Sequence, residues 1–285
     1  MHRVERISNF LAIRRIKYGL LLLSALALIS LLVLLFSPFD PTETSYYSLA
    51  KPLSTSSRGW PFILGTDSLG RDLLTRLSYA FYLDVGVGLV IITISGLIGL
   101  SLGLISGFIG GILDSVIMRI MDILISIPGF ILAIAIAAAL GSSLWNAIFA
   151  VAIVSIPIYA RLVRGMVLSI KENLFVTAAY EAGVSSFRIM IKHILPHVMP
   201  IFITQASMEL SNAILYVAGL SFIGLGAQEP TPEWGLMMSV GRKYIREAWW
   251  YPVFPGIHMF LTILAFNLIG DGIRDYLDPK RKLRS

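Results

Sequence analysis

The sequence contains no cysteine, and only 14% of its residues are charged. The first absence excludes disulfide bonds, thiolate metal sites and cysteine nucleophiles. The second argues against an ordinary soluble domain, in which about 25% of residues carry charge. Hydrophobic residues make up 56% of the 285 positions, and the mean hydropathy is +0.79. This balance is typical of a chain with several membrane-spanning segments.

The sequence also lacks two common catalytic signatures, since no GxxxxGK(S/T) or HExxH pattern occurs in it. Its one GxSxG match, Gly99–Gly103, lies inside a long apolar run. We therefore expect no catalytic residue, no cofactor and no metal site in this chain. His258 has no carboxylate or second histidine at ligand spacing. The net charge of +6 comes from basic residues beside apolar segments, which favours membrane topology over nucleic-acid binding.

Apolar runs of membrane-spanning length predict an all-α, polytopic membrane protein with six transmembrane helices. The first run is long for a signal peptide and lacks a cleavage site, so we expect an uncleaved helix. The spans are expected at 18–36, 85–109, 123–140, 145–163, 201–223 and 251–269. The expected organisation is a cytoplasmic segment 1–17, the first helix 18–36, an extracytoplasmic segment 37–80, a permease-like core 81–274 with a polar hairpin at 164–200, and a cytoplasmic tail 275–285.

Charge and tryptophan distribution predict the orientation. With both termini inside, 16 of the 23 lysines and arginines lie on the cytoplasmic side, as the positive-inside rule requires. The tryptophans then fall outside or at the outer interface, where we expect an aromatic belt. They are Trp60, Trp145, Trp234, Trp249 and Trp250.

Two local patterns predict packing. Gly96, Gly99, Gly103 and Gly107 recur every three or four residues, which indicates a helix face that another helix approaches closely. Before that span, the sequence around Thr66 and Asp67 resembles a helix N-terminus, so we expect a capped surface helix with an Asp67–Arg71 pair.

A polar stripe runs along the fifth predicted span. Gln205, Glu209, Asn212 and Tyr216 are four, three and four residues apart, so they share one helical face. A polar face in hydrocarbon is costly unless it meets protein or water. A translocation pathway and a seam of interhelical hydrogen bonds both explain the stripe; for the ionisable Glu209 we favour the pathway.

The polar hairpin at 175–200 is expected to be a short helix, a turn at 183–186 and a second short helix that ends near Pro196. On the cytoplasmic side, such a hairpin suits docking onto a soluble partner. It resembles the cytoplasmic loop of ABC importer membrane subunits, whose pattern is EAA-x3-G-x9-I-x-LP. The glycine, the two alanines and the final LP match, whereas Thr177 and His193 depart from the pattern. The resemblance implies ATPase coupling through Thr177, Ala178, Ala179, Glu181, Gly183, Leu195 and Pro196.

Three further stretches resemble the second permease subunit of dipeptide, oligopeptide and nickel importers. They are Leu64–Arg76, Gly219–Gly235 and Ala265–Lys280. The resemblance implies the type I permease fold of ABC importers in the cell membrane and a heterodimer with a homologous permease. It also implies two ATP-binding subunits, which bind ATP and magnesium, and an extracytoplasmic substrate-binding protein.

The substrate implied is a dipeptide or oligopeptide. Nickel and oligosaccharide import are the alternatives within the family. An ion-coupled carrier is a further alternative, although it would leave the docking hairpin without a role.

Overall fold

The computed structural model describes residues 13–44, 47–57 and 59–277, which are mostly helical. The predicted terminal segments 1–17 and 275–285 lie largely outside the described residues. The longer helices are α2 (Arg14–Phe36), α3 (Leu73–Ile109), α4 (Gly111–Ser126), α5 (Gly129–Leu140), α6 (Leu144–Lys171), α9 (Leu195–Phe222) and α11 (Trp250–Leu277). The shorter elements are β1 (Ser54–Thr55), β2 (Pro61–Phe62), α7 (Leu174–Glu181), α8 (Ser186–Arg188), the π-helix η1 (Ile189–Ile194), α10 (Trp234–Gly241) and the 3-10 helix η2 (Arg242–Tyr244).

Helices α2, α3, α6 and α11 are each long and apolar enough to cross a membrane. The pair α4 and α5 is a fifth candidate, bent by 93° at its break. Helix α9 has 28 residues, the same number as α6 and α11, but it is not among these apolar candidates. The described residues therefore hold four or five apolar spans, and the remaining predicted span is the more polar helix α9.

The predicted third span, 123–140, is wrong as a single helix. Helix α4 ends at Ser126, Ile127 is extended with ψ 134°, and α5 begins at Gly129. Pro128 accounts for the break, because proline has no N–H to donate and disfavours a helical conformation in the residue before it. The bend in this pair of helices leaves room between α5, α6 and α9.

The second span begins earlier than predicted. Helix α3 starts at Leu73, and its cap is Asp72, whose Oδ2 accepts a hydrogen bond from the Thr75 amide at 2.8 Å. The predicted surface helix beginning near Asp67 is wrong, since the chain before Leu73 is a loop closed by a bridge between Thr66 and Asp72. Asp67 and Arg71 do pair, with 2.5 Å between Oδ2 and Nε, but both are buried.

Three of the four glycines of the α3 stripe pack against another helix backbone as predicted, whereas a Cβ on the fourth, Gly96, would meet the ring of Phe202 on α9. A Cβ on Gly99 would lie 2.5 Å from the Cβ of Tyr159, and one on Gly103 would lie 2.6 Å from the carbonyl oxygen of Ala160. Gly107 meets Val167 in the same way. These contacts let α3 and α6 approach closely. Among the described helices, these two share the most extensive contact.

The tryptophans only partly match the expected belt. Trp60, Trp145 and Trp249 are exposed, whereas Trp234 and Trp250 are buried. Trp250 packs against the loop before α3 and donates from Nε1 to the Thr66 carbonyl at 3.4 Å. These two side chains fill the core instead of lying at a membrane surface.

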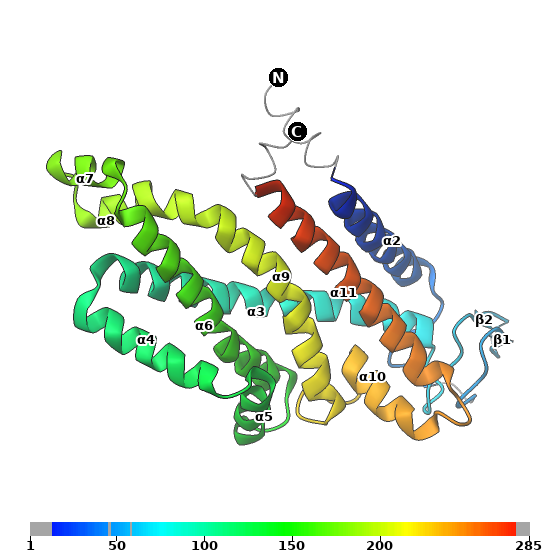
Figure 1. The fold of residues 1–285 in the computed structure, drawn as a ribbon. Helices are drawn as coiled ribbons and strands as arrows, with labels where there is room; N and C mark the ends of the chain where they lie inside the picture. The colour runs from blue at the N-terminus through cyan, green and yellow to red at the C-terminus, as the bar shows by residue number, and fades with distance from the viewer. Residues whose placement is uncertain (1–12, 45–46, 58, 278–285) are drawn as a thin grey trace.

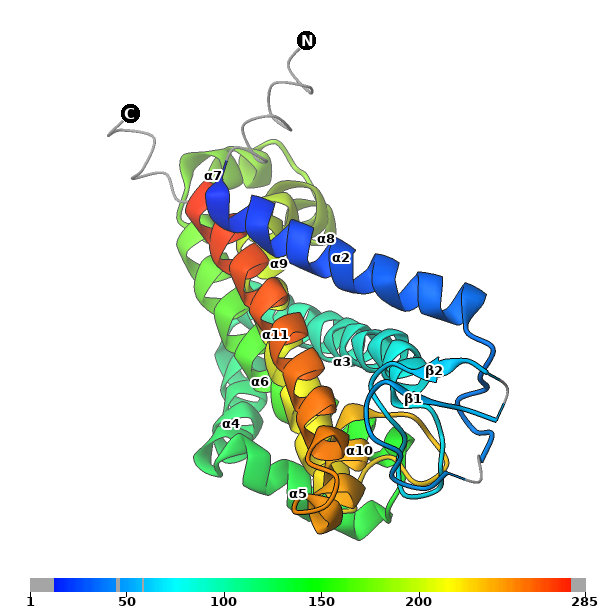
Figure 2. The same cartoon turned by 90° about the vertical axis from the view of Figure 1, so that its right-hand side faces the viewer.

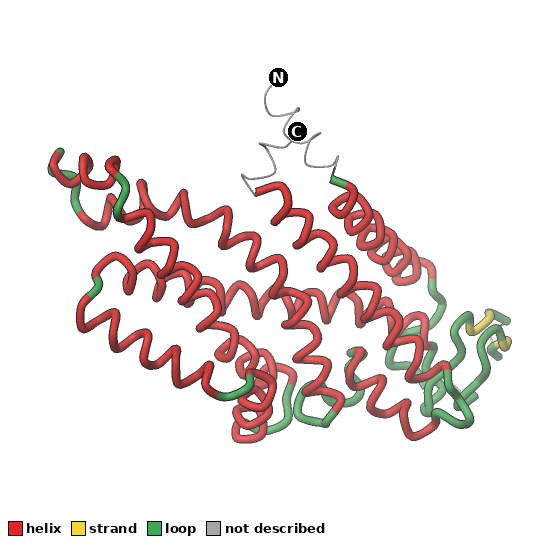
Figure 3. Tube along the Cα trace, in the orientation of Figure 1, coloured by secondary structure: helices red, strands yellow, loops and turns green. Residues whose placement is uncertain are grey.

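The long helices connect two ends of the molecule (Figure 1). Helices α7 and α8 lie at the same end as the start of α2 and the end of α11, and Arg15 pairs with Asp275 there at 3.3 Å. We call this the hairpin end. The antiparallel strands β1 and β2, with Ser54 opposite Phe62, and α10 lie at the other end, which we call the outer end (Figure 2). Long loop segments gather around the strands (Figure 3).

The substitution Gly103→Ala should destabilise the fold by about 1–3 kcal/mol, because the new methyl group would overlap the Ala160 carbonyl oxygen. Gly86→Ala on the same helix is the matched control, since nothing lies within 4 Å of its Cβ position. Thermal unfolding of the purified proteins in detergent measures both. An unchanged midpoint for Gly103→Ala would contradict the close packing of α3 on α6.

Candidate functional site

A cavity of about 250 Å³ lies where the α4–α5 break meets α6 and α9. Three of the four predicted pathway residues line it, namely Glu209, Asn212 and Tyr216. Gln205 does not line it but contacts Glu209. The other walls come from the α4–α5 junction and from the face of α6 around Ser155. The polar stripe therefore faces a space inside the helix bundle.

The carboxylate of Glu209 is held by its own helix. Its Oε1 accepts from Gln205 Nε2 at 3.0 Å, and its Oε2 accepts from Asn212 Nδ2 at 3.4 Å. Glu209 is only 9% exposed. In the described part of the chain no other helix donates a hydrogen bond to it, so its observed bonds do not form the interhelical seam considered above.

The break between α4 and α5 also shapes the cavity. Gly129 begins α5, and a Cβ there would lie 3.1 Å from Val154 and 3.4 Å from the hydroxyl of Tyr216. The ring of Tyr216 packs on Phe130, with 5.4 Å between centroids. The absence of a side chain at Gly129 thus lets the start of α5 approach both α6 and α9.

Two ion pairs tie α4 to α6, and none of their residues lines this cavity. Arg164 donates two hydrogen bonds to Asp114, from Nε to Oδ1 and from Nη2 to Oδ2, both at 2.6 Å. Arg161 pairs with Asp122 nearby. The sequence shows charges within apolar segments at these positions, but their pairing depends on how the two helices lie and was not predicted.

The turn after α7 has the geometry expected at Gly183. Its φ is +74°, a conformation that glycine adopts without strain. The Val184 amide donates to the Ala179 carbonyl at 3.1 Å, and the Gly183 amide donates to the Tyr180 carbonyl at 3.0 Å. This pair of bonds is a Schellman motif, and it fixes the reversal of the chain.

The second arm of the hairpin differs from the prediction. It does not end near Pro196, because α8, η1 and α9 follow one another without a break from Ser186 to Phe222. Pro196 lies in the first turn of α9, where its missing N–H removes no hydrogen bond within that helix. The hairpin and the cavity residue Glu209 are therefore parts of one continuous helical segment.

The hairpin buries one face against the bundle and exposes the other. Val176, Ala179, Ile189 and Ile194 pack in a buried cluster with α3 and α6. Leu195 is half-buried. The remaining predicted coupling residues are exposed, namely Thr177, Ala178, Glu181, Gly183 and Pro196. Leu174 and Phe187 stand out from this surface at 87% and 71% exposure, and the sequence patterns missed both.

At the outer end, two of the sequence stretches singled out above meet. Arg71 binds Asp67 from its own loop and Glu229 from the segment before α10, the latter at 2.7 Å. Burial lowers the pKa of Arg71, but the two carboxylates outweigh it and raise the pKa above its ordinary value. Burial also raises the pKa of Glu233 to about 7. The ion pairs of Arg71 fix the outer segment onto the loop between α9 and α10.

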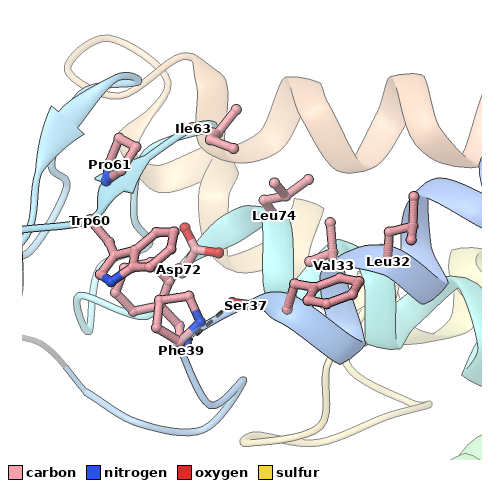
Figure 4. A pocket seen from close by; sticks show the side chains of 11 residues that line it. Leu32, Val33, Ser37, Phe39, Trp60, Pro61, Ile63, Asp72 and Leu74 are labelled. Carbon is pink, nitrogen blue, oxygen red and sulfur yellow. Dashed lines mark hydrogen bonds between the residues drawn. The ribbon is translucent and has the colours of Figure 1, made fainter.

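A larger pocket, about 390 Å³, lies at the outer end of α2 (Figure 4). Its lining is apolar apart from Ser37 and Asp72, and the drawn side chains come from α2 and the loop after it, from β2 and the residues on either side of it, and from the start of α3. Oδ2 of Asp72 already accepts from the amide and hydroxyl of Thr75 at 2.8 and 2.7 Å. The one carboxylate of this pocket is therefore engaged in capping α3.

Comparison with known proteins identifies relatives over most of the chain. The probable D,D-dipeptide transport system permease protein DdpC of Escherichia coli is 46% identical, covering 90% of this chain and 86% of its own. The di/tripeptide transport system permease protein DppC of Pseudomonas aeruginosa is 44% identical, covering 93% and 88%. The glutathione transport system permease protein GsiD of Escherichia coli is 45% identical, covering 76% and 72%.

A solved structure of the MetNI methionine ABC transporter, in an inward-facing conformation, contains a chain with the same fold. Its TM-score is 0.52 at 21% identity, and the match covers 70% of this chain and 97% of that one. The family model described as binding-protein-dependent transport system inner membrane component matches residues 99–283. The chain belongs to this family of multi-pass inner-membrane transport proteins.

Proposed function

We propose that this chain is one permease subunit of an ATP-driven peptide importer, and that it forms the translocation pathway together with a second, homologous permease. The observation that carries the proposal is the continuous segment Ser186–Phe222, which joins an exposed hairpin to the polar cavity. The names of the relatives favour peptides as substrate over nickel or oligosaccharides. Two ATP-binding subunits would bind ATP and magnesium, and an extracytoplasmic binding protein would deliver the peptide.

The proposed topology has six spans, with α9 as the additional one. Helix α9 packs against α3, α6 and α11 and matches α6 and α11 in length. With α4 and α5 counted as one span, the chain crosses the membrane an even number of times. Both ends of the described chain then lie on the hairpin side, and that side is cytoplasmic by the positive-inside rule. Two of the seven basic residues on the other side, Arg71 and Arg76, are buried in the outer cluster.

In this mechanism the ATPases bind the exposed face of the hairpin, which includes Thr177, Ala178, Glu181 and Gly183. The buried face holds the hairpin on α3 and α6. Closure of the ATPases would therefore move the hairpin together with α9 and change the walls of the cavity. The coupling comes from contacts that differ between the two states, as any allosteric linkage requires.

Leu174→Asp should weaken ATPase binding, because it places a charge on the most exposed large apolar side chain of the hairpin, at 87% exposure. We expect about tenfold less ATPase to co-purify with the permease pair, which corresponds to the 1–3 kcal/mol typical of one apolar contact. Leu53→Asp, on a leucine 74% exposed at the outer end, is the control and should retain the ATPases. Full retention in Leu174→Asp would argue against docking at this surface.

The orientation of the chain in the membrane can be determined by labelling single introduced cysteines, since the chain has no cysteine of its own. Ser57→Cys, at the outer end, should react with a membrane-impermeant maleimide in intact cells. Ser185→Cys, in the hairpin turn, should react only after the membrane is permeabilised. Both serines are exposed, so access alone decides the result. The reverse pattern would overturn the proposed topology.

A further inference from the structure

Among the described residues, Glu209 differs from the carboxylates of the neighbouring helix α4 in having no basic partner. Asp114 and Asp122, on α4, each pair with an arginine of α6. Within the part of the chain that the structure describes, Glu209 forms no ion pair and receives only the two amide hydrogen bonds from its own helix. An ionised carboxylate in the middle of a membrane-spanning helix is costly unless a counter-charge or water balances it.

The geometry leaves room for such a counter-charge. Each carboxylate oxygen has two lone pairs, and the amides of Gln205 and Asn212 use one on each oxygen. The cavity in front of Glu209 also presents Ser155 and Tyr216, and most of its other lining side chains are apolar. A primary ammonium group has three donors and one positive charge, so it fits one carboxylate with neighbouring hydroxyl groups.

The size of the cavity limits what it holds. At about 250 Å³ it is smaller than typical pockets for whole ligands, which span about 300–1,000 Å³. It therefore suits one end of a substrate whose remainder lies elsewhere in the pathway. A transport site must also release its ligand, and the two amides already stabilise the carboxylate when the ammonium leaves.

We propose that Glu209 is the centre of a subsite for a primary ammonium group, supplied by the amino terminus of the transported peptide. The identity of the substrate rests on the proposed function above, whereas the ammonium chemistry rests on Glu209 and its cavity. The subsite orients the peptide with its amino end against α9 and its remaining chain towards the partner permease.

The test compares the rates at which charged reagents modify a cysteine placed in the cavity of the complete transporter. Ser155, on α6, lines the same cavity as Glu209 and is replaced by cysteine. After each rate is divided by the rate of the same reagent with free 2-mercaptoethanol, the trimethylammonium-ethyl methanethiosulfonate should react faster than the anionic sulfonatoethyl reagent, by roughly fivefold or more for a charge at short range. Glu209→Gln should bring this normalised ratio down to about one, because it keeps the shape of the side chain and removes its charge.

Two controls make the result specific. Glu172→Gln removes the same charge at the far end of α6 and should leave the rate ratio unchanged. Val154→Cys, on the same cavity wall, is a second reporter if Ser155→Cys does not assemble. Partner-subunit cysteines are measured in a parallel sample that lacks the introduced cysteine.

Protection by substrates identifies the source of the ammonium group. Dialanine at millimolar concentration should slow labelling by a neutral methanethiosulfonate at least about twofold, and Glu209→Gln should remove this protection. N-acetyl-dialanine should not protect. Protection by N-acetyl-alanyl-lysine would show that a side-chain ammonium also enters the subsite.

Equal normalised rates for the cationic and anionic reagents with Glu209 intact would overturn the subsite, and so would equal protection by dialanine and its acetylated form. Labelling needs neither ATP nor the binding protein. ATP-driven peptide uptake combined with equal normalised labelling rates for the cationic and anionic reagents would therefore reject the subsite alone. A normal charge ratio without ATP-driven uptake would reject the proposed function alone.

Discussion

The unbroken helical segment from Ser186 to Phe222 is the constraint on which the mechanism depends. A helix resists compression and bending along its backbone hydrogen bonds, so movement imposed at one end reaches the other. One end of this segment belongs to an exposed hairpin, and its middle carries Glu209. Pro200 lies inside α9 and has no N–H to donate there, and the π-helical stretch Ile189–Ile194 precedes α9. These are the positions where the segment departs from a regular α-helix.

Other parts of the molecule hold this segment in place. The glycine face of α3 lets α6 pack closely, and the two helices together support the buried side of the hairpin. The break at Pro128 turns α5 away and opens the cavity that Glu209 faces. At the outer end, Arg71 joins the loop before α3 to the loop after α9.

The parts of this arrangement that could be read from the sequence are those set by local pattern. Hydropathy located α2, α3, α6 and α11, and the four-three-four spacing placed Glu209, Asn212 and Tyr216 on one face. Gly183 indicated the turn because few other residues adopt its conformation easily. What could not be read depends on contacts between distant segments. The partners of Asp114 and Asp122, the continuation of the helix through Pro196, and the exposure of Leu174 and Phe187 all follow from how the helices pack.

The most direct test of ATP-driven import measures uptake of a labelled dipeptide into proteoliposomes that contain this chain, its partner permease and the two ATPases, with the binding protein outside. One set of vesicles contains ATP and no ion gradient, and the other has a proton gradient and no ATP. Uptake should require ATP and be independent of the gradient. Uptake driven by the gradient without ATP would contradict the role of the hairpin and favour an ion-coupled carrier.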